Sequence, residues 1–255
     1  MFSISLQPGS VFHVLGFNVT NTLLTTLIVT IILVIGSLTF YFIKPKKHNI
    51  LIKGIKILIF ELLKLTDSVT KDRRLSKKIL PLIATFFLFI MTSNLMALIP
   101  GFLGSLFIDT AEGRVSLLRS PNSDLNTTLA LALFSITAIQ FFSITTLGLK
   151  NYLTRFFNFA GPIAFITGFF ELISEGIKIL SFSFRLFGNI FAGEILLLIM
   201  AFLLPYIIPI PFIILEIFVG IVQAFIFTAL TLTFIKISTI PHTNPQTTPS
   251  VIKNQ

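Results

Sequence analysis

Long stretches without charge constrain this chain more than any other feature of its sequence. Residues 1–43 contain no Asp, Glu, Lys or Arg, and residues 186–235 contain only two charged side chains. Hydrophobic residues make up 54% of the 255 residues and charged residues only 11%, whereas soluble domains carry about 25% charged residues. Together with a mean hydropathy of +0.96, this composition excludes a water-soluble enzyme or binding module.

Five apolar stretches are long enough to cross a bilayer, because a membrane helix needs about 20 apolar residues. They cover residues 21–43, 79–99, 125–149, 161–205 and 211–235. The fourth stretch is the longest, and charged residues interrupt it. We therefore predict an all-α polytopic membrane protein with five to six membrane helices, forming a single membrane domain over residues 1–255.

The positive charge is concentrated in one segment. Residues 44–78 contain eleven Lys or Arg and three acids, which accounts for +8 of the net charge of +9. A basic segment directly after an apolar span is typical of the inner side of a membrane. The N-terminus and the 100–124 loop are then expected outside, and the 150–160 loop and the C-terminal tail inside. A nucleic-acid partner is not expected, because no basic–aromatic module fits in so short a segment.

Residues 50–66 predict a different kind of helix. On a helical wheel their charged side chains fall within about 140°, and Ile, Leu and Phe fill the other face; the charged residues are Lys53, Lys56, Glu61 and Lys64. This pattern indicates an amphipathic helix that lies in the membrane interface. This helix either contacts anionic lipid or a partner subunit for a functional reason, or it is only a surface anchor.

Three ionisable residues lie in the most apolar part of the chain: Arg185, Glu194 and Glu216. Such groups cost about 2.5–3.5 kcal/mol each in a membrane and are candidates for a functional site. The alternative for Arg185 is that its long side chain extends to the interface. Because Arg is not deprotonated in proteins, Arg185 is a fixed positive charge, whereas the two Glu can take up and release protons.

Helical geometry predicts which of these residues share a face. Arg185 and Glu194 are nine residues apart, about 13.5 Å along the axis and on opposite faces. Ser181 and Asn189 share the face of Arg185, and Glu216 shares a face with Gln223, seven residues later. Because a buried cation without a partner is costly, a carboxylate from another subunit is expected opposite Arg185.

Other charged groups have local interpretations. Glu175 and Lys178 are spaced for an ordinary i, i+3 ion pair; alternatively, they and Glu171 line a polar path to the inside. Asp124 and Asn126 precede an apolar run and are predicted to be helix N-caps.

The sequence predicts neither a metal site nor a cofactor. There is no Cys, which excludes disulfides, thiolate metal sites and Cys nucleophiles. The three His are scattered along the chain, which disfavours a histidine metal site; they are His13, His48 and His242.

Four segments resemble subunit a of the F-type ATP synthase over nearly the whole chain from about residue 20. The most specific is SFSFRLFGNIFAGE at 181–194, followed by GIVQAFIF at 220–227. NLMALIP at 94–100 and PNSDLNTTLA at 121–130 are similar to two earlier motifs of that family.

The resemblance implies a non-catalytic stator subunit with two long, tilted last helices beside a rotating ring of c subunits. It places Arg185 opposite a ring carboxyl, separating two offset half-channels for protons. The outer half-channel is implied to contain Glu194, Glu216, Asn189 and Gln223, and the inner one Glu171 and Ser181. The implied partners are the c-ring, the peripheral-stalk b subunits and the lipid bilayer.

Two residues depart from part of that family. Members often pair a Glu with a His where this chain has Glu194 and Glu216, and some carry an acid where this chain has Ala97. Since two close carboxylates do not both ionise cheaply, we hypothesise that Glu194 and Glu216 share one proton near neutral pH.

Two other functions remain open at this point. A self-contained proton-coupled transporter would show internal repeats and broken helices, and an intramembrane enzyme a nucleophile–base or metal constellation; the sequence indicates neither. The motifs favour a bacterial plasma membrane over a mitochondrial or plastid membrane, and the choice between H⁺ and Na⁺ stays open.

Overall fold

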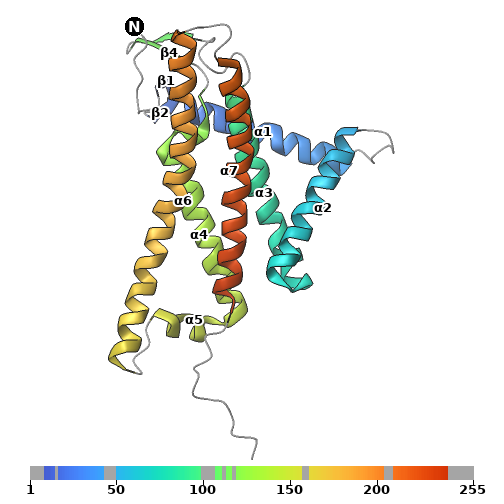
Figure 1. The fold of residues 1–255 in the computed structure, drawn as a ribbon, viewed down its shortest axis with the longest axis vertical. Coiled ribbons are helices and arrows are strands. Elements are labelled where there is room, and N and C mark those ends of the chain that lie inside the picture. The colour runs from blue at the N-terminus through green and yellow to red at the C-terminus, as the bar shows by residue number, and fades with distance from the viewer. Residues whose placement is uncertain are drawn as a thin grey trace, which may run out of the picture.

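The structure, a computed structural model, describes residues 9–14, 17–42, 50–98, 107–110, 113–116, 119–156, 161–203 and 209–240. This part of the chain is almost entirely α-helical (Figure 1), which confirms the predicted all-α fold. Its α-helices are α1 (Asn21–Phe42), α2 (Ile50–Thr70), α3 (Arg73–Ala97), α4 (Leu125–Leu147), α5 (Leu149–Phe156), α6 (Pro162–Leu203) and α7 (Pro209–Ser238).

Among the described residues, five helices are long and apolar enough to cross a membrane: α1, α3, α4, α6 and α7. The fourth predicted stretch forms one continuous helix, α6, in spite of its charges. With 42 residues, α6 is about 63 Å long, whereas the hydrocarbon core of a bilayer is about 30 Å thick. A helix of this length must tilt strongly or extend beyond the core, and Figure 1 shows α6 inclined to α7.

Two helical segments differ from the prediction. Helix α3 begins at Arg73 rather than at residue 79, because the Asp72 side chain caps it by accepting a hydrogen bond from the Arg74 N–H. A good N-cap thus extends the helix into the basic segment that precedes the apolar stretch. The predicted 150–160 loop contains α5, which Gly148 separates from α4 with a φ of 79°, a conformation that suits glycine.

Short elements that the sequence did not predict occur before α1 and between α3 and α4. Strand β1 (Ser10–Val14) pairs with β2 (Phe17–Thr20), and β3 (Phe107–Thr110) pairs with β4 (Gly113–Ser116), both antiparallel. The 3₁₀ turn η1 (Pro121–Ser123) leads directly into α4. These hairpins fall in segments expected outside the membrane, and open strand edges are compatible with water but not with lipid.

The core lies between α3, α4, α6 and α7. Phe227 of α7 packs edge-on against Phe86 of α3 and Phe182 of α6, with ring centroids 5.4 and 4.9 Å apart. Hydroxyl pairs also join the helices, at 3.1 Å between Thr128 and Ser183 and at 2.9 Å between Ser135 and Thr231. Small hydroxyl residues allow membrane helices to approach closely and to bond across the interface.

Helix α1 is attached to this bundle mainly by its first turns. Asn21, Thr22, Thr25 and Val29 are buried, whereas Ile35 is 58% exposed. Figure 1 shows α1 diverging from the other long helices. In a membrane protein, an exposed apolar helix of this kind faces lipid or another subunit.

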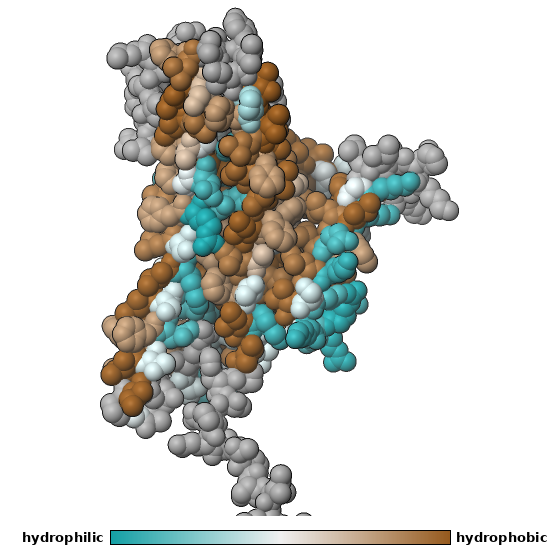
Figure 2. All heavy atoms as spheres, in the orientation of Figure 1, coloured by the Kyte–Doolittle hydropathy of each residue, from teal (hydrophilic) through white to brown (hydrophobic). Residues whose placement is uncertain are grey.

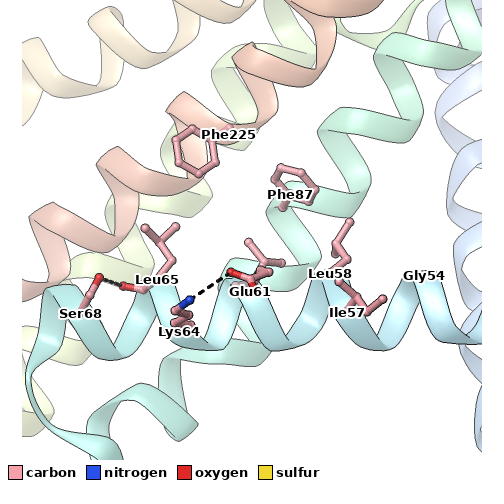
Figure 3. A pocket seen from close by; sticks show the side chains of 10 residues that line it. Gly54, Ile57, Leu58, Glu61, Lys64, Leu65, Ser68, Phe87 and Phe225 are labelled. Carbon is pink, nitrogen blue, oxygen red and sulfur yellow. Dashed lines mark hydrogen bonds and ion pairs between the residues drawn. The ribbon is translucent and has the colours of Figure 1, made fainter.

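Helix α2 has the predicted amphipathic character and reaches Thr70, four residues beyond the predicted end. Leu62 is buried in the core, whereas three lysines of α2 are exposed: Lys53, Lys56 and Lys64. A mostly apolar groove of about 550 Å³ lies where α2 meets Phe87 of α3 and Phe225 of α7. Figure 3 shows the side chains that line it. Figure 2 shows hydrophilic residues gathered where α2 and α3 meet, as expected for the inner membrane surface.

We predict that Ile90→Ala destabilises the bundle, because Ile90 is fully buried in the core cluster. The loss should be about 2–5 kcal/mol, as for large-to-small core substitutions. It can be measured as the unfolding midpoint of the purified full-length chain in detergent, followed by circular dichroism. Ile35→Ala on the exposed side of α1 is the matched control, and an equal loss in both variants would contradict the assigned core.

Candidate functional site

Arg185 lies near the middle of α6 and is half-exposed. Its Nη2 donates to Ser181 Oγ at 3.3 Å, one turn back along the helix, as their shared face predicted. Among the described residues, no carboxylate lies within ion-pair distance of Arg185.

Asn189 and Gln223 connect α6 to α7. The Asn189 Nδ2 donates to Gln223 Oε1 at 2.8 Å. Gln223 is only 2% exposed, and its Nε2 has no hydrogen-bond partner within the described ranges. Sequence analysis predicts Asn189 on the face of Arg185 and Gln223 on the face of Glu216. The structure joins these two amides in one hydrogen bond, one turn beyond Arg185.

Glu194 forms an ion pair that sequence reasoning missed. The Arg119 Nε donates to both of its carboxylate oxygens, at 3.0 Å to Oε1 and 3.2 Å to Oε2. The sequence places Arg119 only in the 100–124 loop, which is expected outside. Its position two residues before the PNSDLNTTLA motif is the sequence signal that could have indicated this contact.

Glu216 of α7 is packed directly against the backbone of α6. A Cβ added at Gly193 would overlap the carboxylate of Glu216. Glycine at 193 leaves room for the carboxylate in this position, and a larger residue would require the end of the Glu216 side chain to shift. Glu216 therefore lies beside Glu194, close enough for the two charges to interact, which places the two predicted carboxylates together.

Buried amides join the segment before α4 to α3 and α7. The Asn122 Nδ2 donates to Asn94 Oδ1 at 2.7 Å, and the Asn94 Nδ2 donates to the Gly220 carbonyl at 3.0 Å. Both asparagines are nearly inaccessible, at 0% and 3% exposure. Their bonds fix η1 against α3 and α7.

Asp124 is the N-cap of α4, as predicted, and its side chain accepts from the Asn126 N–H. Asn126 is not a cap: it lies inside the first turn as the donor to Asp124. The second carboxylate oxygen of Asp124 accepts from Thr22 Oγ1 at 3.0 Å, which ties the start of α1 to the start of α4.

The N-terminal half of α6 carries a separate set of charges. Glu175 and Lys178 form the predicted i, i+3 ion pair at 2.8 Å, and Lys178 also lies 4.9 Å from the centre of the Phe234 ring. Glu171 is half-buried and ten residues from Ser181, about 15 Å along the helix. The structure does not bring these two predicted inner residues into contact.

Along α6, the polar residues form a broken hydrophilic stripe in an apolar surface (Figure 2). The fold and this stripe define a multi-pass membrane protein with ionisable groups in its membrane helices. The family described as ATP synthase A chain matches residues 23–236. The chain therefore belongs to the ATP synthase A chain family, and its apolar helices place it in the membrane sector of the F-type ATP synthase.

Relatives support this assignment over most of the chain. An ATP synthase subunit a of Moorella thermoacetica is 32% identical over 235 residues, covering 90% of this chain and 95% of that protein. One of Legionella pneumophila is 30% identical over 230 residues, covering 88% of each chain. One of Helicobacter pylori is 37% identical over 175 residues, covering 66% of this chain and 69% of that protein.

Replacing Asn94 by Ala is expected to destabilise the outer end of the bundle. It removes the donor to Gly220 and leaves the buried Asn122 Nδ2 without its acceptor, and each such loss costs about 1–3 kcal/mol. Detergent-solubilised chain should unfold at lower temperature, and protease should cut the segment before α4 more rapidly. Asn126→Ala, whose side chain is exposed, is the control; equal stability of the two variants would contradict the assigned network.

Proposed function

We propose that the chain is the stator subunit through which protons reach and leave a rotating ring of c subunits. The observation that carries this proposal is Arg185: a permanent cation in the middle of a membrane helix, half-exposed and held by Ser181, with no carboxylate partner in the described part of the chain. A charge in such a position is costly unless an opposite charge meets it. A carboxyl on each ring subunit supplies that charge.

Electrostatics give Arg185 two functions in this proposal. A fixed cation favours the ionised form of a nearby carboxyl, so that a ring carboxyl arriving at Arg185 releases its proton. The same cation repels protons, and thus blocks a direct leak between the two sides. Because Arg does not itself deprotonate, it cannot pass the proton on.

The outer half-channel consists of Glu194, Glu216, Asn189 and Gln223. Their support is the order of these groups along the two helices: Asn189 is one turn beyond Arg185, about 6 Å, and Glu194 follows about 7.5 Å further. The Asn189–Gln223 bond and the Glu216–Gly193 contact bring the α7 residues to the same two levels. Polar groups then lead from the outer end of the bundle to Arg185.

On the inner side, Glu171 and Ser181 are the groups that we assign to the exit path. Ser181 bonds the guanidinium, and Glu171 lies nearer the inner end of α6. They do not touch each other, so that water or the surface of the ring must complete this path.

The surface around Arg185 suits a closely packed partner. Ser181, Gly188 and Ala192 share the face of Arg185 on α6. Ser181 and Ala192 are exposed and Gly188 is half-exposed, so that this face carries small residues. We assign this face to the c-ring, and the exposed apolar face of α1 to the b subunits or lipid. The chain works without an active site of its own, in the plasma membrane of a bacterium, as its bacterial relatives suggest.

Arg185→Ala is expected to abolish ATP-driven proton pumping, because the ring carboxyls lose the cation that favours their ionised form. The assembled head should still hydrolyse ATP. The measurement is quenching of a pH-sensitive dye in inverted membrane vesicles, with hydrolysis assayed in the same sample. Arg74→Ala, at an exposed arginine near the start of α3, is the control, and normal pumping by Arg185→Ala would refute the proposal.

Gly193→Ala should also impair pumping, for a steric reason. The new methyl group occupies the position of the Glu216 carboxylate, which must move away, and small displacements of reacting groups reduce rates by on the order of tenfold or more. Gly176→Ala on the same helix meets no atom within 4 Å and should pump normally. If the two variants pump equally well, Glu216 does not act from the position seen here.

A further inference from the structure

Arg119 is the only described basic side chain that bonds a carboxylate of the proposed outer half-channel. Its Nε reaches both oxygens of Glu194, and its guanidinium carbon lies 5.8 Å from the centre of the Phe191 ring, one turn back on α6. The side chains of Arg119 and Glu194 are only 12% and 27% exposed. A largely desolvated ion pair of this kind holds both side chains in place more firmly than an exposed one.

The backbone that carries Arg119 is itself fixed. The Arg119 N–H donates to Oγ1 of Thr25 at 3.3 Å, and Thr25 is fully buried in α1. Immediately after Arg119, Asn122 bonds Asn94 of α3 and Asp124 bonds Thr22 of α1. The guanidinium is therefore presented to α6 by a segment anchored to two other helices.

This ion pair makes the two carboxylates of the site unequal. Glu194 is paired with a permanent cation at 3.0 Å. Glu216 lies against Gly193 and, within the described ranges, has no cation within ion-pair distance. When two neighbouring carboxyls hold one proton, the proton resides on the one without a cationic partner.

We propose that Arg119 is a positioning residue of the outer half-channel, which holds Glu194 ionised and immobile so that Glu216 is the carboxyl that carries the proton. This inference rests on the proposed function. In each cycle, a proton from the outer side binds an oxygen of the Glu216 carboxylate and then leaves for a ring carboxylate. Glu194 keeps its charge throughout, and neither glutamate changes its net state over the cycle.

The test uses the whole complex with four variants: Arg119→Gln, Arg119→Lys, Glu194→Gln and the double variant Arg119→Gln/Glu194→Gln. Infrared spectra at one neutral pH identify the carboxylate band of Glu194 as the band that Glu194→Gln removes. In Arg119→Gln this band should shift to that of a protonated carboxyl, whereas Arg119→Lys should retain the ionised band. Pumping per assembled complex should fall by about tenfold in Arg119→Gln and by less than twofold in Arg119→Lys.

The double variant distinguishes a positioning role of Arg119 from a role in folding and assembly. If Arg119→Gln alone fails to assemble, the double variant should assemble like Glu194→Gln, because it no longer buries an unpaired charge. Failure of the double variant where Glu194→Gln assembles overturns the inference, as does an unshifted Glu194 band in Arg119→Gln. Arg185→Ala is measured alongside, with Arg74→Gln as a control. Pumping by Arg185→Ala refutes the proposed function. Loss of pumping in Arg185→Ala, together with normal pumping and an unshifted Glu194 band in Arg119→Gln, refutes only this inference.

Discussion

The hydrocarbon core of the membrane offers no water to a polar group, and the rest of this structure depends on that constraint. Backbone groups meet it by forming long helices, of which α6 is the longest described. Side chains meet it in pairs: Glu194 with Arg119, Asn189 with Gln223, and Glu175 with Lys178. Arg185 has only a serine as its partner within the described chain, and this is the basis on which we propose that another subunit supplies the opposing carboxyl.

Several polar contacts near the start of α4 join segments that are distant in sequence. Thr22 of α1 bonds Asp124, Asn94 of α3 bonds Asn122, and Arg119 bonds Glu194 of α6. The short segment from residue 119 to 124 takes part in every one of these contacts. It acts as a connector that holds α1, α3 and α6 in register, and a buried hydrogen-bond network of this kind tolerates few alternative arrangements.

Sequence patterns predicted the helices well where apolar length alone decides the outcome, and less well at their ends. The start of α3 was missed by six residues because Asp72 caps the helix ahead of the apolar stretch. The break at Gly148 and the short helix α5 were missed because a positive φ is not encoded in hydropathy. The continuity of α6 was left open, since charges on one face of a helix resemble the end of a span when only composition is considered.

The sequence by itself determined that this is a multi-pass membrane protein with one cation and two carboxylates in its most apolar region, because the cost of burying charge makes such residues conspicuous. It also predicted that Arg185 and Glu194 would face apart, since helical geometry is local. Only the tertiary structure decided that Glu194 meets Arg119, 75 residues away in sequence, and that Glu216 fills the space beside Gly193. These contacts depend on how α6, α7 and the segment before α4 pack together, and packing across separate elements leaves no periodic signal in the chain.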